Sequence, residues 1–207
     1  PLKTVNRHGL IAGATGTGKT KTLQVFVEQL SHKGIPTLVM DIKGDLSGIA
    51  VEGEQNDKIN ERYAKTKLPY QPQSFPVELM TISAEKGLKL RATVTEFGPV
   101  LLSKILGLNE TQSSIMSIVF KYADDKALPL IDLDDLKKVL QYVTDNAEGK
   151  KELADNYGSI SPASLGAILR SIVAMEQQGA TSFFGEPSFD VEDLLQTRGG
   201  KGVVNVL

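Results

Sequence analysis

The pattern of apolar and polar positions at the start of the chain predicts a strand, a loop and a helix. Residues 7–12 form an apolar run that is expected to be a short buried strand. A glycine-rich turn follows, and Leu23, Phe26, Val27 and Leu30 then recur at helical spacing. The chain therefore opens in the order that is typical of an α/β protein.

Further strands are expected on both sides of a polar stretch. Residues 37–41 are a second apolar run that ends in a carboxylate, Asp41. Residues 51–76 show little periodicity and are expected to form an excursion on the surface. Residues 77–82 and 89–95 are predicted as further strands.

From Gly98 onward the pattern becomes helical and predicts four amphipathic helices. Their predicted starts are Pro99, Asn109 or Thr111, Asp134, and Ser161 with Pro162. These helices lie between two strand regions, which is the pattern of a helical insertion or lid in an α/β domain.

The resulting fold class is α/β, with a mostly parallel sheet and a helical insertion. Residues 1–97 would form the core that holds the glycine-rich turn, residues 98–187 the insertion and residues 188–207 the return to the core sheet. The chain opens just before one apolar run and stops inside another. We therefore expect it to be a piece of a longer protein, cut before the strand that would carry a second acidic motif.

Composition narrows the class of protein. The 207 residues are 41% hydrophobic and 23% charged, which suits one large globular domain or one domain with an insertion. Cysteine is absent, so disulfides, thiolate metal sites and cysteine nucleophiles are excluded. The net charge of −2 does not indicate nucleic-acid binding, but it does not exclude a local basic surface that binds nucleic acid. No apolar run is long enough to span a bilayer, so a soluble, cytoplasmic protein without membrane contacts is expected.

The glycine-rich turn carries the strongest chemical signal. Residues 13–20 match G-x-x-x-x-G-K-[ST] at every fixed position, between an expected strand and an expected helix. Glycines let successive backbone N–H groups face phosphate oxygens, and the helix N-terminus adds positive potential. An ordinary glycine-rich turn is the alternative interpretation.

Specific roles follow from this motif. Lys19 is the expected catalytic cation on the β- and γ-phosphates, and Thr20 the expected Mg²⁺ ligand. The expected phosphate-binding residues are Gly13, Ala14, Thr15, Gly16, Thr17, Gly18, Lys19 and Thr20, with Thr22 one turn into the helix. ATP and Mg²⁺ are the expected cofactors.

Hydrolysis also needs a carboxylate near the metal. Asp41 ends the second strand, where ligands bind in open parallel sheets, and is a candidate catalytic residue and second-shell partner of the metal. The alternative is that Asp41 merely ends the strand or caps the next turn. Asp45 is a weaker candidate.

Other charged residues have simpler interpretations. The pairs Asp124-Asp125 and Asp134-Asp135 are expected to be solvated charges at helix starts or in loops. Arg91, Arg170 and Arg198 could act on a neighbouring subunit, but salt bridges or solvent exposure are the commoner roles of such arginines.

Beyond the P-loop, the chain resembles the helicase HerA-like C-terminal domain family of the HerA–FtsK class. The matching segments are residues 6–20, 41–48, 91–94, 97–99, 106–112 and 184–187. The joint occurrence of Asp-Ile-Lys-Gly-Asp and Leu-Asn-Glu-Thr-Gln with the P-loop makes the resemblance more specific than the P-loop alone.

The resemblance implies a RecA-like sheet, ATP as the nucleotide, and a homo-oligomeric ring, commonly a hexamer, that moves a polymer such as double-stranded DNA. It also implies a phosphate site at the P-loop and an acidic strand end at Asp41. The family's Asp-Glu pair has no counterpart in these residues. The expected function is ATP binding and hydrolysis by a motor ATPase. The alternatives are a nucleotide-binding scaffold or regulatory module, and a small-molecule P-loop kinase.

Overall fold

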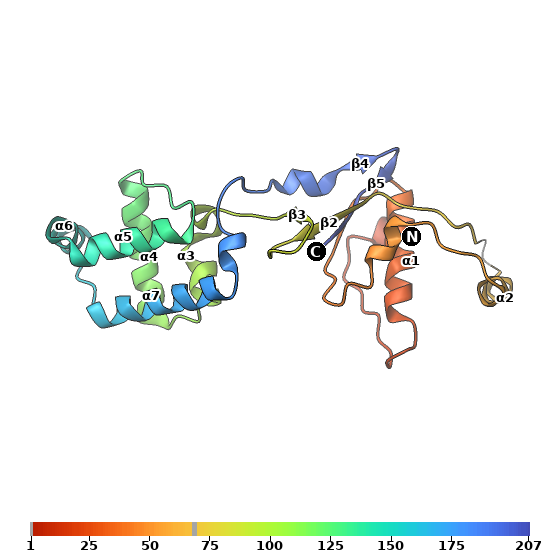
Figure 1. Cartoon of the computed structure of the whole chain (residues 1–207), viewed down its shortest axis with the longest axis horizontal. Helices are drawn as coiled ribbons and strands as arrows, with labels where there is room; N and C mark the ends of the chain where they lie inside the picture. Colours follow the sequence, from red (N-terminus) through yellow and green to blue (C-terminus); the bar gives the residue numbers. More distant parts are fainter. Residues whose placement is uncertain (1, 68–69) are drawn as a thin grey trace. The chain divides into compact units, whose positions relative to one another are not determined.

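The computed structural model describes residues 2–67 and 70–207, and the chain divides into two compact units (Figure 1). The residues up to Met80 form the first unit together with Asp190–Leu207, and Thr81–Phe189 form the second. The first unit thus contains both ends of the chain, whereas the second is one continuous segment.

The first unit is built on a parallel sheet. Strand β6 (Val204–Val206) lies between β1 (Thr37–Val39) and β2 (Val77–Thr81) and runs parallel to both. The order across the sheet is β1-β6-β2-β3, where β3 is Leu88–Lys89. The expected α/β class with a mostly parallel sheet is confirmed.

Helix α1 (Lys19–His32) packs against this sheet through its apolar face (Figure 1). The predicted core positions Val27 and Leu30 are buried, while Phe26 is 49% exposed. The buried cluster between helix and sheet contains Val27, Val39, Leu46, Ile49, Phe75, Val204 and Val206. The helix is therefore held by residues from both ends of the chain.

A short antiparallel hairpin leads into β6 and also fixes the far end of α1. It consists of β4 (Thr197–Arg198) and β5 (Lys201–Gly202). The Ser31 hydroxyl donates to the Gly202 carbonyl over 2.6 Å. A Cβ atom at Gly202 would lie 2.2 Å from the backbone of Ile35, so a larger residue does not fit.

Residues 7–12 do not form the predicted strand. Leu10 is 89% exposed and Ile11 is 44% exposed. The first strand of the described chain is β1. An apolar run becomes a strand only where a neighbour completes its backbone hydrogen bonds, and no described residue pairs with this run. Without pairing, the expected burial is also missing.

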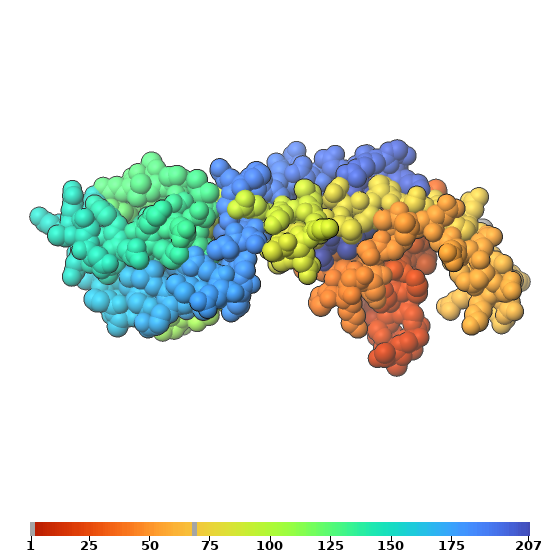
Figure 2. Space-filling view, viewed as in Figure 1, coloured from red at the N-terminus to blue at the C-terminus, as the bar shows by residue number. Residues whose placement is uncertain are grey.

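The connections of the first unit contain short helices. These are η1 (Leu2–Thr4), η2 (Ser47–Ala50), α2 (Asp57–Thr66) and η4 (Val191–Leu195). The α2 helix, which the sequence pattern did not predict, is capped by Asn56 and has no buried residue. Figure 2 shows it protruding from the first unit, as expected for a surface excursion.

The second unit is a bundle of helices with its own core. The helices are α3 (Val94–Ile105), α4 (Glu110–Asp125), α5 (Leu133–Asp145), α6 (Ala147–Tyr157), α7 (Pro162–Gln177) and η3 (Ala180–Ser182). Leu102, Met116, Leu136, Ile168 and Ile172 are completely buried in this core. The amphipathic pattern of the sequence is therefore satisfied within the bundle.

Two helices start where the local capping chemistry is best rather than where the sequence predicted. Helix α3 starts before Gly98, because Thr93 and Glu96 form a capping box, and it bends at Gly98, where φ is 75°. The strand predicted at 89–95 is wrong: β3 ends at Lys89, Ala92 makes only an isolated bridge with Phe184, and residues 94–95 belong to α3. Asp132, not Asp134, caps α5 by accepting from the Asp135 N–H over 2.9 Å.

The other helix starts agree with the sequence, with one helix added. Asn109 caps α4 in a second capping box, and Ser161 precedes Pro162 at the start of α7. The sequence pattern did not predict α6, whose cap Asn146 accepts from the N–H groups of Glu148 and Gly149. Its short, weakly apolar sequence hides the periodicity on which the prediction relies.

No single helix in the described ranges is long and apolar enough to cross a membrane. Helices α6 and α7 meet the length and composition criterion only as a pair, and they are bent by 107° relative to each other.

Replacing Leu136 by alanine tests the core of the second unit. Leu136 is fully buried, so Leu136→Ala should lower the free energy of unfolding by about 2–5 kcal/mol. Leu128, which is 42% exposed, provides a matched control, and Leu128→Ala should cost only about 0.5 kcal/mol. Urea denaturation followed by circular dichroism measures both, and equal losses would contradict the assigned core.

Candidate nucleotide-binding site

The P-loop, residues 13–20, forms the turn that enters α1 (Figure 1). Two of its glycines have left-handed backbone conformations, with φ of 81° at Gly16 and 92° at Gly18. A side chain at either position would strain the backbone. Gly18 is also the N-cap of α1, so the helix begins at Lys19. The glycines of the motif therefore occupy positions that require them.

Hydrogen bonds inside the loop fix its shape. The Ala14 carbonyl accepts from the Thr17 N–H over 3.3 Å and from the Thr17 hydroxyl over 2.8 Å. A Cβ atom at Gly13 would lie only 2.5 Å from the Thr17 hydroxyl oxygen, so Gly13 allows the loop to close. The loop is thus a compact turn held by its own backbone.

The ammonium group of Lys19 lies across the same turn. It donates to the Ala14 carbonyl over 2.8 Å, which places a positive charge beside the loop backbone. The N-cap Gly18 has no side chain to satisfy the first N–H groups of α1, so these groups remain free to bind an anion. The loop, the lysine and the helix terminus together form an anion-binding arrangement.

The site is open at the surface. Residues 13–17 are exposed, and Lys19 and Thr20 are partly buried. The Thr22 hydroxyl donates to the Gly18 carbonyl over 3.0 Å, so its side chain is turned back onto the helix. A phosphate group therefore has access to the loop backbone and to Lys19 without a change in the helix.

Asp41 organises the turn that follows β1. Its Oδ1 accepts from the N–H groups of Gly44 and Asp45 over 2.9 and 3.2 Å, and its Oδ2 accepts from the Leu46 N–H over 2.8 Å. The Asp41 N–H donates to the Leu207 carbonyl over 2.6 Å. Asp41 thus follows β1 by two residues and caps the turn, and this cap agrees with the alternative interpretation of the residue.

These bonds also affect the ionisation of Asp41. Burial raises its pKa, but the backbone hydrogen bonds of the turn, that from Leu46 foremost, together hold the pKa below its usual value. Asp41 is therefore a carboxylate at neutral pH.

A family model described as Helicase HerA-like C-terminal matches residues 1–207. The chain belongs to this family. Membership associates it with DNA-related ATPases of the helicase type. A search of curated proteins found no match.

Two of the three candidate arginines in this HerA-like chain are engaged within their own unit. Arg91 donates to the carbonyls of Glu186 and Phe184 over 2.6 and 3.2 Å. Arg198 forms an ion pair of 2.6 Å with Glu78. Arg170 is exposed on α7. Structural contacts therefore account for Arg91 and Arg198, as the sequence favoured.

The acidic pairs also serve the helices. Asp125 pairs with Lys121 on the same helix, and Asp134 pairs with Lys137 over 2.7 Å. Asp135 accepts from the Ile131 N–H over 3.1 Å. The described residues contain no group of three or more acidic, histidine or cysteine side chains that could hold a metal.

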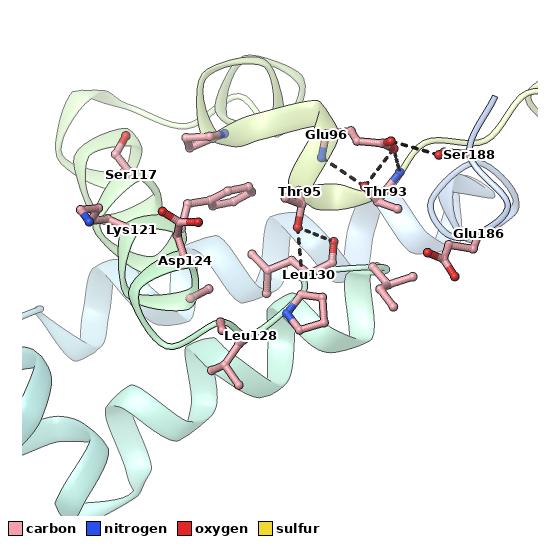
Figure 3. A pocket seen from close by; sticks show the side chains of 16 residues that line it. Thr93, Thr95, Glu96, Ser117, Lys121, Asp124, Leu128, Leu130, Glu186 and Ser188 are labelled. Carbon is pink, nitrogen blue, oxygen red and sulfur yellow. Dashed lines mark hydrogen bonds between the residues drawn. The ribbon is translucent and has the colours of Figure 1, made fainter. Parts of the chain in front are cut away.

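A separate pocket of about 840 Å³ lies in the second unit and contains no P-loop residue (Figure 3). Three carboxylates line it, those of Glu96, Asp124 and Glu186. Figure 3 shows that the Glu96 carboxylate accepts from the Thr93 hydroxyl over 2.9 Å and from the Ser188 hydroxyl over 3.0 Å. Lys121 also lines the pocket, but it is paired with Asp125. The carboxylates therefore outweigh the lining cation, and the pocket does not suit a nucleotide triphosphate.

Sequence reasoning overlooked one residue near the P-loop. Gln24 of α1 is 8% exposed, and its side-chain amide donates to the Asp45 carbonyl over 2.8 Å. Its position four residues after Thr20, on the same face of the helix, was the available signal.

The turn capped by Asp41 should contribute stability that depends on pH. Because the pKa of Asp41 is lowered on folding, this stability is present above about pH 4 and is lost as the pH falls through the lowered value. Asp41→Ala should lower the free energy of unfolding by about 1–2 kcal/mol at pH 7. The difference from the wild type should shrink at pH 3.

Urea denaturation at both pH values measures this effect. Asp45→Ala is the control, because the turn uses only the backbone of Asp45. A deficit of Asp41→Ala that is the same at both pH values would contradict the assigned role of the carboxylate.

Proposed function

We propose that this chain binds ATP with Mg²⁺ at residues 13–20 and is the N-terminal, nucleotide-binding part of the ATPase core of a HerA-like motor. The observation that carries the proposal is the conformation of the P-loop. Its glycines, the ammonium group of Lys19 and the free N–H groups of α1 converge on one exposed turn in a chain of the HerA-like family.

The donors at this turn fit the phosphate groups of a nucleotide. Phosphate oxygens would accept from the loop N–H groups, and Lys19 would exchange the Ala14 carbonyl for the β- and γ-phosphates. Thr20, in the first turn of α1, would offer its hydroxyl to Mg²⁺. The bound ion would neutralise part of the triphosphate charge.

Asp41 fits a supporting role better than direct metal ligation. An ionised carboxylate has about four acceptor positions, and three hydrogen bonds of the turn already use Asp41. The capacity that remains would suit a water molecule of the metal's hydration shell rather than the metal itself. Asp41 would therefore act in the second shell, and its lowered pKa keeps it charged for that role.

We further propose that hydrolysis drives movement along a polymer, with double-stranded DNA as the first candidate, in a homo-oligomeric ring. Family membership supports this proposal. Turnover would also need an acidic pair that orients the attacking water. Among the described residues, Asp125 and Asp134 form ion pairs on their helices and Asp135 accepts from a backbone N–H. Both pairs, Asp124-Asp125 and Asp134-Asp135, lie outside the unit that holds the P-loop.

The location of these acidic pairs outside the P-loop unit supports a second candidate function, nucleotide binding without turnover by a scaffold or regulatory module. In this case the nucleotide would stabilise the loop and α1 without being hydrolysed. The two functions differ in whether bound ATP is converted to ADP.

ATP binding should depend on Lys19. Lys19→Ala should weaken Mg-ATP binding by about 100-fold or more, because it removes a charge-assisted contact to the phosphates. Lys33→Ala is the matched control, since Lys33 is an exposed lysine at the opposite end of α1. Fluorescence titration with a labelled ATP analogue measures both, and equal affinities for the two variants would refute the assigned site.

Motor activity should depend on double-stranded DNA. Steady-state ATP hydrolysis should rise when double-stranded DNA is added to the longest natural form of the protein that contains this chain. The stimulation should vanish in Lys19→Ala. Tight ATP binding without turnover would instead support the scaffold function, and turnover that DNA does not change would point to another polymer.

A further inference from the structure

The face of α1 that carries Thr20 also carries Gln24, whose side chain makes a polar contact with the turn after β1. Thr20 and Gln24 are separated by four residues, so they lie one above the other, about 6 Å apart along the helix axis. Side chains in a helix lean toward its N-terminus. The Gln24 side chain therefore extends toward the P-loop end of α1.

Gln24 holds the turn by its backbone. Its amide donates to the Asp45 carbonyl over 2.8 Å, and the side chain is almost completely buried. The N–H group of the same Asp45 donates to Asp41. Asp45 is therefore held by two side chains: Gln24 binds its carbonyl, and Asp41 binds its N–H group.

An apolar contact completes the attachment one helical turn further on. Leu46, at the end of the turn, is 3% exposed and belongs to the same buried cluster as Val27 of α1. By itself, the apolar contact would set only the distance between turn and helix, because burial of apolar surface has no preferred direction. The hydrogen bond of Gln24 adds direction and so sets how the turn is oriented beside the helix.

We propose that Gln24 is a positioning residue that holds the turn of residues 41–46 against α1, so that the Asp41 carboxylate would support Mg²⁺ bound with the nucleotide. This inference rests on the proposed function. It assigns to Gln24 a role in the metal requirement of nucleotide binding, separate from the contact of the P-loop with the phosphates.

The substitution Gln24→Met tests the inference, because methionine has a similar length and volume but no hydrogen-bond donor. The Mg²⁺ concentration for half-maximal binding of a fluorescent ATP analogue should rise about 3- to 10-fold, the factor that corresponds to one lost hydrogen bond. ATP affinity in EDTA should stay within about twofold of the wild type, because the P-loop contacts are untouched. Gln24→Glu should raise the Mg²⁺ requirement further, since its carboxylate faces the Asp45 carbonyl.

The matched control is Gln29→Met, which makes the same change at an exposed position of the same helix. It should leave the Mg²⁺ requirement unchanged. Amide hydrogen exchange provides a readout without nucleotide: in Gln24→Met, the N–H groups of Gly44, Asp45 and Leu46 should exchange faster than in Gln29→Met.

Three results would overturn the inference. The first is an unchanged Mg²⁺ requirement in Gln24→Met while the wild type binds Mg-ATP. The second is an equal loss of affinity with and without Mg²⁺, which would show that Gln24 supports α1 and the P-loop in general. The third is a wild type that binds no nucleotide and is indistinguishable from Lys19→Ala, which would refute the proposed function itself.

Discussion

The insertion of β6 between β1 and β2 is the contact on which the first unit depends. β1 and β2 do not pair with each other: β1 is joined to the sheet through β6, and β2 lies between β6 and β3. Parallel strands need long connections, and here the whole second unit lies within the connection between β2 and β6. The sheet therefore forms only when the C-terminal strand reaches β1 and β2, and the helix that carries the P-loop packs on that sheet.

The candidate site follows from this sheet in two ways. The buried cluster that joins α1 to the strands holds the helix, and thereby presents its N-terminus and Lys19 at the surface. The hydrogen bond from Asp41 to Leu207 then fixes the start of the turn after β1 to the continuation of β6. The helix that follows the P-loop and the acidic turn are thus supported by the same strand, although they come from different segments of the chain.

The second unit shows how ordinary polar contacts account for residues that look catalytic in a sequence. Arg91 binds the carbonyls of the returning segment, and the pairs at Asp125 and Asp134 are ion pairs along helices. Its core is separate from that of the first unit, and its helices are started by side-chain caps. The unit is therefore stabilised by contacts of its own.

The sequence by itself determined the features that depend on neighbouring residues. The P-loop turn needs glycine at Gly16 and Gly18, and most helices of the second unit show their apolar periodicity and caps locally. The tertiary structure alone decided the features that need a distant partner. Residues 7–12 lack a strand to pair with, Asp41 is satisfied by backbone N–H groups that only the folded turn brings together, and Gln24 meets Asp45 only after α1 has packed on the sheet. The physical reason is that a hydrogen bond between distant segments forms only after the chain has closed the loop between them.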